Sequence, residues 1–195
     1  MFIFLAVFII FVLILNFAIH KNNHSQENVQ EQFWENERQA NFTRRKDIHN
    51  LNYLTIPIEK IPQNLHTDAE KTLLELCNKK MLNLSGKTNT DLKLEYGVAN
   101  LEELSLCDSR FYDFVCAVST YAGELLENGQ TDAARELLEL AVTYHADNSS
   151  IYTQLAELYK EKGETGKLPS LIEAAKTLPP MSAQITLEKL KACQS

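Results

Sequence analysis

The chain has 195 residues, a length that suits one soluble domain with a short extra segment. Its formal net charge of −7 makes it a poor binder of nucleic acid and of anionic lipid, because both carry negative charge themselves. The cysteines show no disulfide-framework spacing, which favours buried thiols in a reducing, cytoplasmic setting, with Cys193 the most exposed of them.

An apolar run occupies 1–19, where Asn16 is the one polar residue. As a helix this run would reach roughly 28 Å, close to the ~30 Å hydrocarbon core of a bilayer. A secretory signal peptide would need a basic start, a shorter apolar run and a small-x-small cleavage site, and 1–19 has none of these. We therefore expect a retained single-pass anchor in the cell membrane.

Lys and Arg follow the anchor but none precedes it, which favours a cytoplasmic position for the soluble domain. The alternative is an exported domain, with the anchor reversed or cleaved. The stretch 25–46 predicts a juxtamembrane helix, because its acids come first and Arg44, Arg45 and Lys46 come last, as the helix dipole favours. This basic cluster is either a solvated helix end or a contact with phosphate headgroups.

The segment 51–65 differs in character from the stretch before it. Pro57 and Pro62 exclude a continuous helix here and favour extended backbone before each proline. The segment is also rich in apolar residues, so we expect it to lie across the helical domain and bury alternate side chains. A peptide-like docking strand is the alternative. Together, 20–66 form a stalk and a proline-containing linker.

The region 67–107 is expected to be a helical cap or a degenerate repeat. Thr67 and Glu70 form a capping-box pattern in which each side chain bonds the other's backbone N–H. An apolar stripe at helical spacing runs from there to Leu84. The elements expected after it are two shorter helices, 90–96 and 100–106, separated by Gly97.

Two later stretches repeat one another, Glu127-Asn-Gly-Gln-Thr131 and Glu161-Lys-Gly-Glu-Thr165. When 115–148 is aligned with 149–182, at the same spacing as these two stretches, eight residues are identical, where chance would give about two. The pattern predicts two helical hairpins within 108–182 and a terminal capping helix in 183–195. The expected helix starts are Asp108, Thr131, Asn148 or Ser149, and Thr165, and the expected stop of the last hairpin is Pro179-Pro180.

These hairpins resemble the tetratricopeptide repeat family in key positions and in their period, which is roughly 34 residues in that family. The matching positions are small residues at Ala122, Ala156, Ala134, Ala141 and Ala175, large ones at Leu125, Tyr159, Leu138 and Ile172, turn glycines at Gly129 and Gly163, and Pro180. The departures are Leu168 at a small position, Ala146 at the proline position, and Val118 and Tyr152 where the family favours Trp. The layout also resembles small uncharacterised membrane-anchored proteins of Gram-positive bacteria. The resemblance implies an all-α scaffold or adaptor that binds a protein or peptide.

In that family, partners bind on the concave face of the first helices. The residues expected there are Cys116, Ser119, Thr120, Gly123, Ser150, Thr153, Gln154 and Glu157. None of them is Lys or Arg, so the family's charged clamp for a C-terminal carboxylate is absent. A bound peptide would be held by neutral hydrogen bonds and shape, and the alternative is an ordinary solvated face.

Other motifs are weak. Gly86-Lys-Thr88 has the end of a phosphate-binding loop but Met81 in place of its first glycine. Cys107 and Cys116 lack a histidine at metal-ligand spacing. We therefore expect no catalytic, cofactor-binding or metal-binding residues, although an enzyme hidden within 67–114 remains the alternative function.

Overall fold

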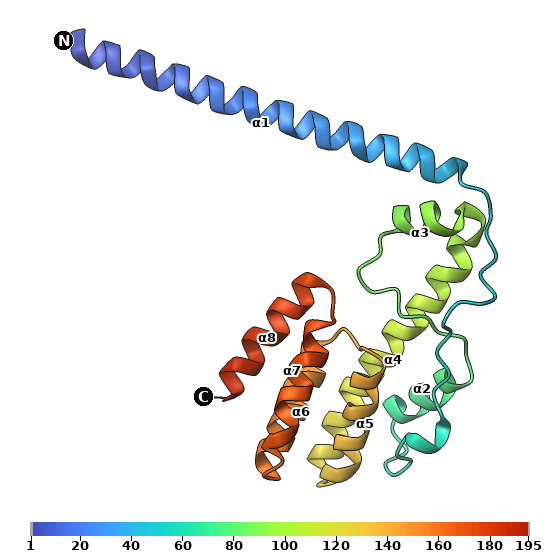
Figure 1. The fold of residues 1–195 in the computed structure, drawn as a ribbon. Coiled ribbons are helices and arrows are strands. Elements are labelled where there is room, and N and C mark those ends of the chain that lie inside the picture. The colour runs from blue at the N-terminus through green and yellow to red at the C-terminus, as the bar shows by residue number, and fades with distance from the viewer. Residues whose placement is uncertain (1, 195) are drawn as a thin grey trace. The chain divides into compact units, whose positions relative to one another are not determined.

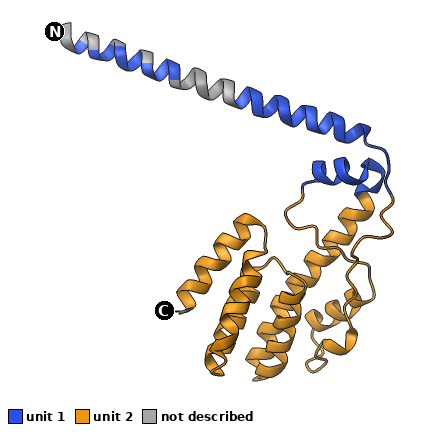
Figure 2. Ribbon diagram, viewed as in Figure 1, with its two compact units in different colours: residues 1–46, 88–101 blue, residues 47–87, 102–195 orange. Residues whose placement is uncertain are grey.

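The computed structural model describes residues 2–194, apart from the side chains of 2, 3, 5, 6, 9, 13, 18–25 and 194. The described chain is helical, and its one β-type pairing is an isolated antiparallel bridge between Leu54 and Met81 (Figure 1). The expectation of an all-α protein is confirmed. The chain divides into two compact units (Figure 2), unit 1 with 1–46 and 88–101, and unit 2 with 47–87 and 102–195.

Unit 1 is built on one long helix, α1 (Phe2–Phe42), which continues without a break from the apolar run into the juxtamembrane stretch. No proline or glycine interrupts it, so nothing in its backbone breaks the helical hydrogen bonds. No helix in the described part of the chain is long and apolar enough to cross a membrane. The expected anchor, 1–19, includes Met1 and several side chains that lie outside the described residues.

The C-terminal end of α1 is held by α3 (Asn89–Tyr96) and by η2 (Val98–Asn100). A capping box between Thr88 and Asp91 starts α3. Asn100 is fully buried, and its amide donates to the carbonyl oxygens of Lys46 (2.8 Å) and Tyr96 (2.7 Å) and accepts from Arg45 Nε (3.1 Å). One member of the basic cluster thus serves the packing of unit 1 and is not simply a solvated helix end.

Unit 2 begins with the segment 47–66, which is irregular apart from η1 (Ile58–Lys60) and has extended backbone at Pro57 and Ile61. Ile56 and Ile61 keep only 2% and 3% of their surface exposed and belong to the main hydrophobic core. The expectation that this segment packs within the molecule is confirmed. We call 51–66 the strap.

The helix α2 (Asp68–Cys77) begins where the sequence pattern places it, with Thr67 Oγ1 accepting the Glu70 N–H. The second half of the expected capping box is wrong, because the Glu70 carboxylate accepts from the N–H groups of Leu65 and His66 instead. The helix also ends at Cys77, well before Leu84.

The apolar residues after α2 are buried without being helical, because tertiary hydrogen bonds hold their backbone. The Leu82 N–H donates to the Cys107 carbonyl (3.2 Å), and the Leu84 N–H donates to the Asp108 carboxylate (3.0 Å). Asp108 therefore starts no helix. It lies inside α4 (Leu101–Glu127). This one continuous helix replaces the short helix expected over 100–106 and the helix expected to start at Asp108.

The repeat region contains α5 (Thr131–Thr143), α6 (Ser149–Glu161), η3 (Thr165–Lys167), α7 (Leu168–Lys176) and α8 (Pro180–Gln194). Gly129 and Gly163 have φ values of +73° and +71°, which is why glycine suits both turns. Asn148 caps α6, whereas Gln130, not Thr131, is the N-cap of α5.

The buried positions of the first helices recur at the offset that relates the two turns. The recurring sets are Val118, Tyr152 and Thr186, and Ala122, Ala156 and Leu190, which lie in α4, α6 and α8 and are all buried. The last helix packs against α6 and α7. The residues that α8 buries are therefore at positions equivalent to the buried residues of α4 and α6, the first helices of the two hairpins.

Candidate functional site

The expected partner face has one half on α4 and one on α6. On α4, Cys116, Ser119 and Gly123 are partly buried and Thr120 is exposed. The Thr120 hydroxyl donates to the Cys116 carbonyl (3.1 Å), which uses its donor within the same helix. A Cβ on Gly123 would meet nothing within 4 Å, so this position is open.

On α6, Ser150, Thr153 and Gln154 are partly buried and Glu157 is exposed. The Thr153 hydroxyl lies 3.1 Å and 3.0 Å from two carbonyl oxygens of its own helix, and Gln154 Nε2 lies 3.3 Å from the Ser150 hydroxyl. Gln154 Oε1 is buried and has no hydrogen-bond partner among the described residues. The hydroxyls of Thr120 and Thr153 thus already use their donors inside their own helices, whereas Gln154 keeps one acceptor free in the described part of the chain.

A hollow of about 460 Å³ lies between α2 and α4 and takes in the exposed edge of the α4 half. Cys116 and Thr120 line it from α4, and Thr72, Glu75 and Lys79 line it from α2 and its C-terminal end. The α4 half of the expected face therefore borders a concavity, but one whose other wall is α2 and not the second repeat.

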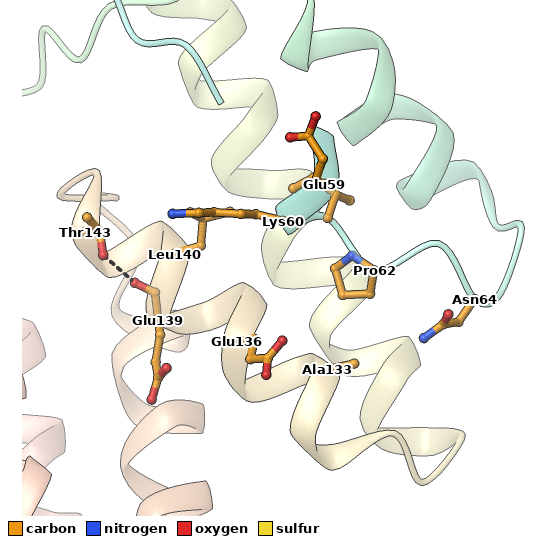
Figure 3. A pocket seen from close by; sticks show the side chains of 10 residues that line it. Glu59, Lys60, Pro62, Asn64, Ala133, Glu136, Glu139, Leu140 and Thr143 are labelled. Carbon is orange, nitrogen blue, oxygen red and sulfur yellow. Dashed lines mark hydrogen bonds between the residues drawn. The ribbon is translucent and has the colours of Figure 1, made fainter. Parts of the chain in front are cut away.

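A larger groove, of about 550 Å³, lies between the strap and α5 (Figure 3). Its apolar lining comes from Ile61, Pro62, Ala133 and Leu140, and its polar lining comes from Glu59, Lys60, Asn64, Glu136, Glu139 and Thr143. We call it the strap groove. One wall is a segment that lies far from α5 in the sequence, so no local pattern in the sequence points to the groove.

A second hollow, of about 360 Å³, shares Glu139 and Thr143 with the strap groove and continues toward α6 and α7. Leu155, Tyr159 and Leu171 contribute to its lining. Because both hollows include Glu139 and Thr143 of α5, they lie next to each other along that helix.

The polar groups that line the two hollows differ in whether they already have a hydrogen-bond or ion-pair partner. Glu139 Oε1 accepts from the Tyr159 hydroxyl (2.9 Å) and from Lys167 Nζ (3.2 Å), so its charge is already matched. Burial, followed by this bond to Glu139, raises the pKa of Tyr159. Glu59 and Glu136 are exposed and have no hydrogen bond or ion pair among the described residues. The strap groove therefore offers two free carboxylates beside Lys60.

A polar network next to Glu139 holds the two hairpins together. Arg135 Nη1 lies 3.2 Å and 3.3 Å from the carboxylate oxygens of Glu164, and Lys167 Nζ lies 2.8 Å from the same carboxylate. The hydrogen bond from Lys167, and then the charges of Lys167 and Arg135, keep the pKa of Glu164 below its ordinary value. These groups fix the second turn against α5, and Lys167 also lines the second hollow.

The cysteines lie apart from these hollows, except for Cys116. All four are free thiols, with Cys77 and Cys107 buried and the other two partly exposed. Burial raises the pKa of Cys77 and of Cys107. Within the described residues, no group of three or more His, Cys, Asp and Glu side chains is arranged to hold a metal ion.

Comparison with protein-family models, with curated proteins and with solved structures found no match for this chain.

Proposed function

We propose that the protein is a membrane-anchored scaffold of tetratricopeptide-like helical hairpins that binds a segment of a partner protein in the strap groove. The repeat assignment is supported by the shared offset at which turns and buried positions recur in α4, α6 and α8. Hairpins of this type bury their apolar faces against one another and leave extended surfaces for partners.

The anchor is supported by the exposed apolar side chains of the first part of α1. Phe4, Phe8, Phe11, Ile14 and Phe17 are large, apolar and more than half exposed. Exposing so many large apolar side chains of one helix to water is unfavourable, whereas in the hydrocarbon core of a bilayer they contact lipid chains. The excess of Lys and Arg after the run and the free thiols favour a cytoplasmic domain.

One observation supports the strap groove as the binding site: it combines an apolar lining from the strap and α5 with the exposed carboxylates of Glu59 and Glu136. Pockets that bind ligands combine apolar lining with a few convergent polar groups. The groove suits an extended peptide with small apolar side chains for its apolar lining and a Lys or Arg for Glu59 and Glu136.

The test is affinity capture of the full chain from its native membranes, followed by mass spectrometry of the bound proteins. Glu136→Arg reverses an exposed charge in the strap groove, and Glu157→Arg makes the same change at an exposed position of the expected face. We expect Glu136→Arg to reduce the captured partner several-fold and Glu157→Arg to leave it unchanged.

Reduced capture by Glu157→Arg and unchanged capture by Glu136→Arg would place the binding site on the expected partner face of α4 and α6 instead. Equal capture by both variants and the wild type would exclude both surfaces. Flotation of the full chain with phospholipid vesicles tests the anchor separately. Labelling of Cys193 in intact cells by a membrane-impermeant thiol reagent would show that the domain lies outside the cell, which contradicts the proposed orientation.

A further inference from the structure

Beyond the apolar run, α1 carries a second apolar patch that nothing in the described part of unit 1 covers. Val29, Phe33 and Trp34 are 64%, 52% and 59% exposed, and with Gln26 and Gln30 they line a shallow hollow of about 460 Å³. The rings of Phe33 and Trp34 meet edge to face at 5.4 Å, which presents them as one surface. Exposed apolar patches of this kind mark interaction surfaces.

We infer that this patch is a helix-pairing seam at which α1 meets α1 of a second copy of the same chain. Gln26, Val29, Phe33, Asn36 and Ala40 follow one another at alternating steps of three and four residues. This is the heptad spacing at which one helix faces another along its length. We call the face of α1 that carries Gln26, Val29, Gln30, Phe33 and Asn36 the α1 seam. It ends there because Ala40 is already buried within unit 1.

Charge distribution favours an identical partner. The α1 helix is acidic in this region, but Glu31 and Glu35 lie on the side away from the seam, where Glu35 is paired with Arg38. The seam itself carries only apolar residues and amides. Two copies can therefore face one another without bringing like charges together, as a two-fold interface requires.

The amides of the seam are self-complementary. Gln26 and Gln30 each carry a donor and an acceptor, so each can bond the same residue of a symmetry-related helix. A bilayer surface is a poorer occupant, because helices that lie on membranes carry Lys and Arg beside their apolar face. Here the flanking groups are amides and acids.

The packing of α3 sets the C-terminal limit of the seam. The Glu37 carboxylate accepts from the Thr90 hydroxyl (2.7 Å) and is paired with Lys93, so α3 covers the end of this helix face. The hydrogen bond from Lys93, and then that from Thr90, lower the pKa of Glu37, which stays ionised in that pair. About three helical turns remain free.

A seam of this length is too short to hold two soluble chains together. Its strength therefore rests on the proposed anchor, which holds two copies parallel, sets Val29 opposite Val29 and raises their effective concentration. We expect the dimer on membranes and not in solution.

Cysteine cross-linking of the full chain in phosphatidylcholine vesicles tests this, in a background that carries Cys116→Ser and Cys193→Ser. Cys77 and Cys107 remain buried in that background. Under mild oxidation we expect Val29→Cys and Phe33→Cys to form disulfide-linked dimers several-fold more than Asn28→Cys and Glu31→Cys, which lie outside the seam.

Adding Phe33→Glu to the Val29→Cys protein should reduce its dimer several-fold, whereas adding Asn28→Glu should not. Equal cross-linking at all four positions, or a maximum at 28 and 31, would overturn the seam. Vesicle flotation of each variant separates the two proposals: a chain that floats but does not cross-link refutes the seam alone. A chain that fails to float refutes the anchor and the membrane-held dimer together.

Discussion

The Tyr121 hydroxyl lies 2.8 Å from a carboxylate oxygen of Glu70, and that same oxygen accepts the N–H groups of Leu65 and His66 at 3.0 Å and 2.9 Å. Glu70 is only 3% exposed. One buried carboxylate of α2 therefore fastens the end of the strap to α4. The wall of the strap groove depends on this fastening, because Pro62 and Asn64 lie just before it.

Removing the Tyr121 hydroxyl should destabilise unit 2. Tyr121→Phe removes a hydroxyl that lies 2.8 Å from the buried Glu70 carboxylate and 2.9 Å from the Pro62 carbonyl oxygen. Hydrogen bonds to charged groups contribute about 1.5–3 kcal/mol. We expect a loss of that size in the free energy of unfolding by urea. Tyr112→Phe is the control on the same helix, because Tyr112 is exposed and its hydroxyl does not contact Glu70; a similar loss there would show that the effect is not specific to Glu70.

Glu70 should make the stability of unit 2 fall in acid. Burial by itself raises the pKa of Glu70, but the hydrogen bonds from Tyr121, Leu65 and His66 outweigh it and hold the pKa below its ordinary value. A carboxyl with a lowered pKa in the folded state stabilises above its unfolded pKa and loses that contribution as the pH falls through the folded pKa.

The measurement is the free energy of unfolding from pH 7 down to pH 3, for the wild type and for Glu70→Gln. We expect the variant to be less stable at pH 7 and to show a shallower decline below about pH 4.5, near the ordinary pKa of Glu. Parallel curves would mean that the acid sensitivity arises from other carboxyl groups.

Gly97 should tolerate no side chain. It has φ of +87°, and a Cβ there would lie 2.7 Å from the Arg44 carbonyl oxygen. Gly97→Ala must therefore push the turn after α3 away from the backbone of Arg44, which follows α1, and it should speed amide hydrogen exchange in α3. Gly123→Ala is the opposite case, because Gly123 is helical with nothing near its added Cβ. That change should stabilise α4 by about 0.4–1 kcal/mol.

The cysteines should react in two classes. Burial raises the pKa of Cys77 and Cys107, which lowers the fraction of reactive thiolate, and it also blocks access to the sulfur. Iodoacetamide at pH 8 should modify Cys116 and Cys193 in the native protein, as mass spectrometry of the digested chain would show. The buried pair should react only after denaturation in urea, and early labelling of either would contradict the core packing.

Local signals in the sequence predicted the helix starts at Thr67 and Asn148 and the turns at Gly129 and Gly163. Each of these depends on side-chain or backbone chemistry within a few residues, which a sequence displays directly.

The errors came from residues whose partners are distant in the chain. Asp108 has the chemistry of a helix cap, but its carboxylate binds the backbone of Leu84, so the helix runs through it. Glu70 has the chemistry of a capping box, but Tyr121 and the strap compete for its carboxylate. The strap groove was missed for the same reason, since its two walls meet only in the folded chain.

The position of the strap has a mechanical consequence. It lies in the first part of unit 2 that the chain enters after α1, and it is held by two buried isoleucines and by the Glu70 carboxylate. A pull along the chain from α1 would load the contacts of α1 with α3 and η2 first, and the strap once those contacts had given way. Because the strap is one wall of the strap groove, the groove would lose its shape whenever the strap detaches, even while α5 stays folded.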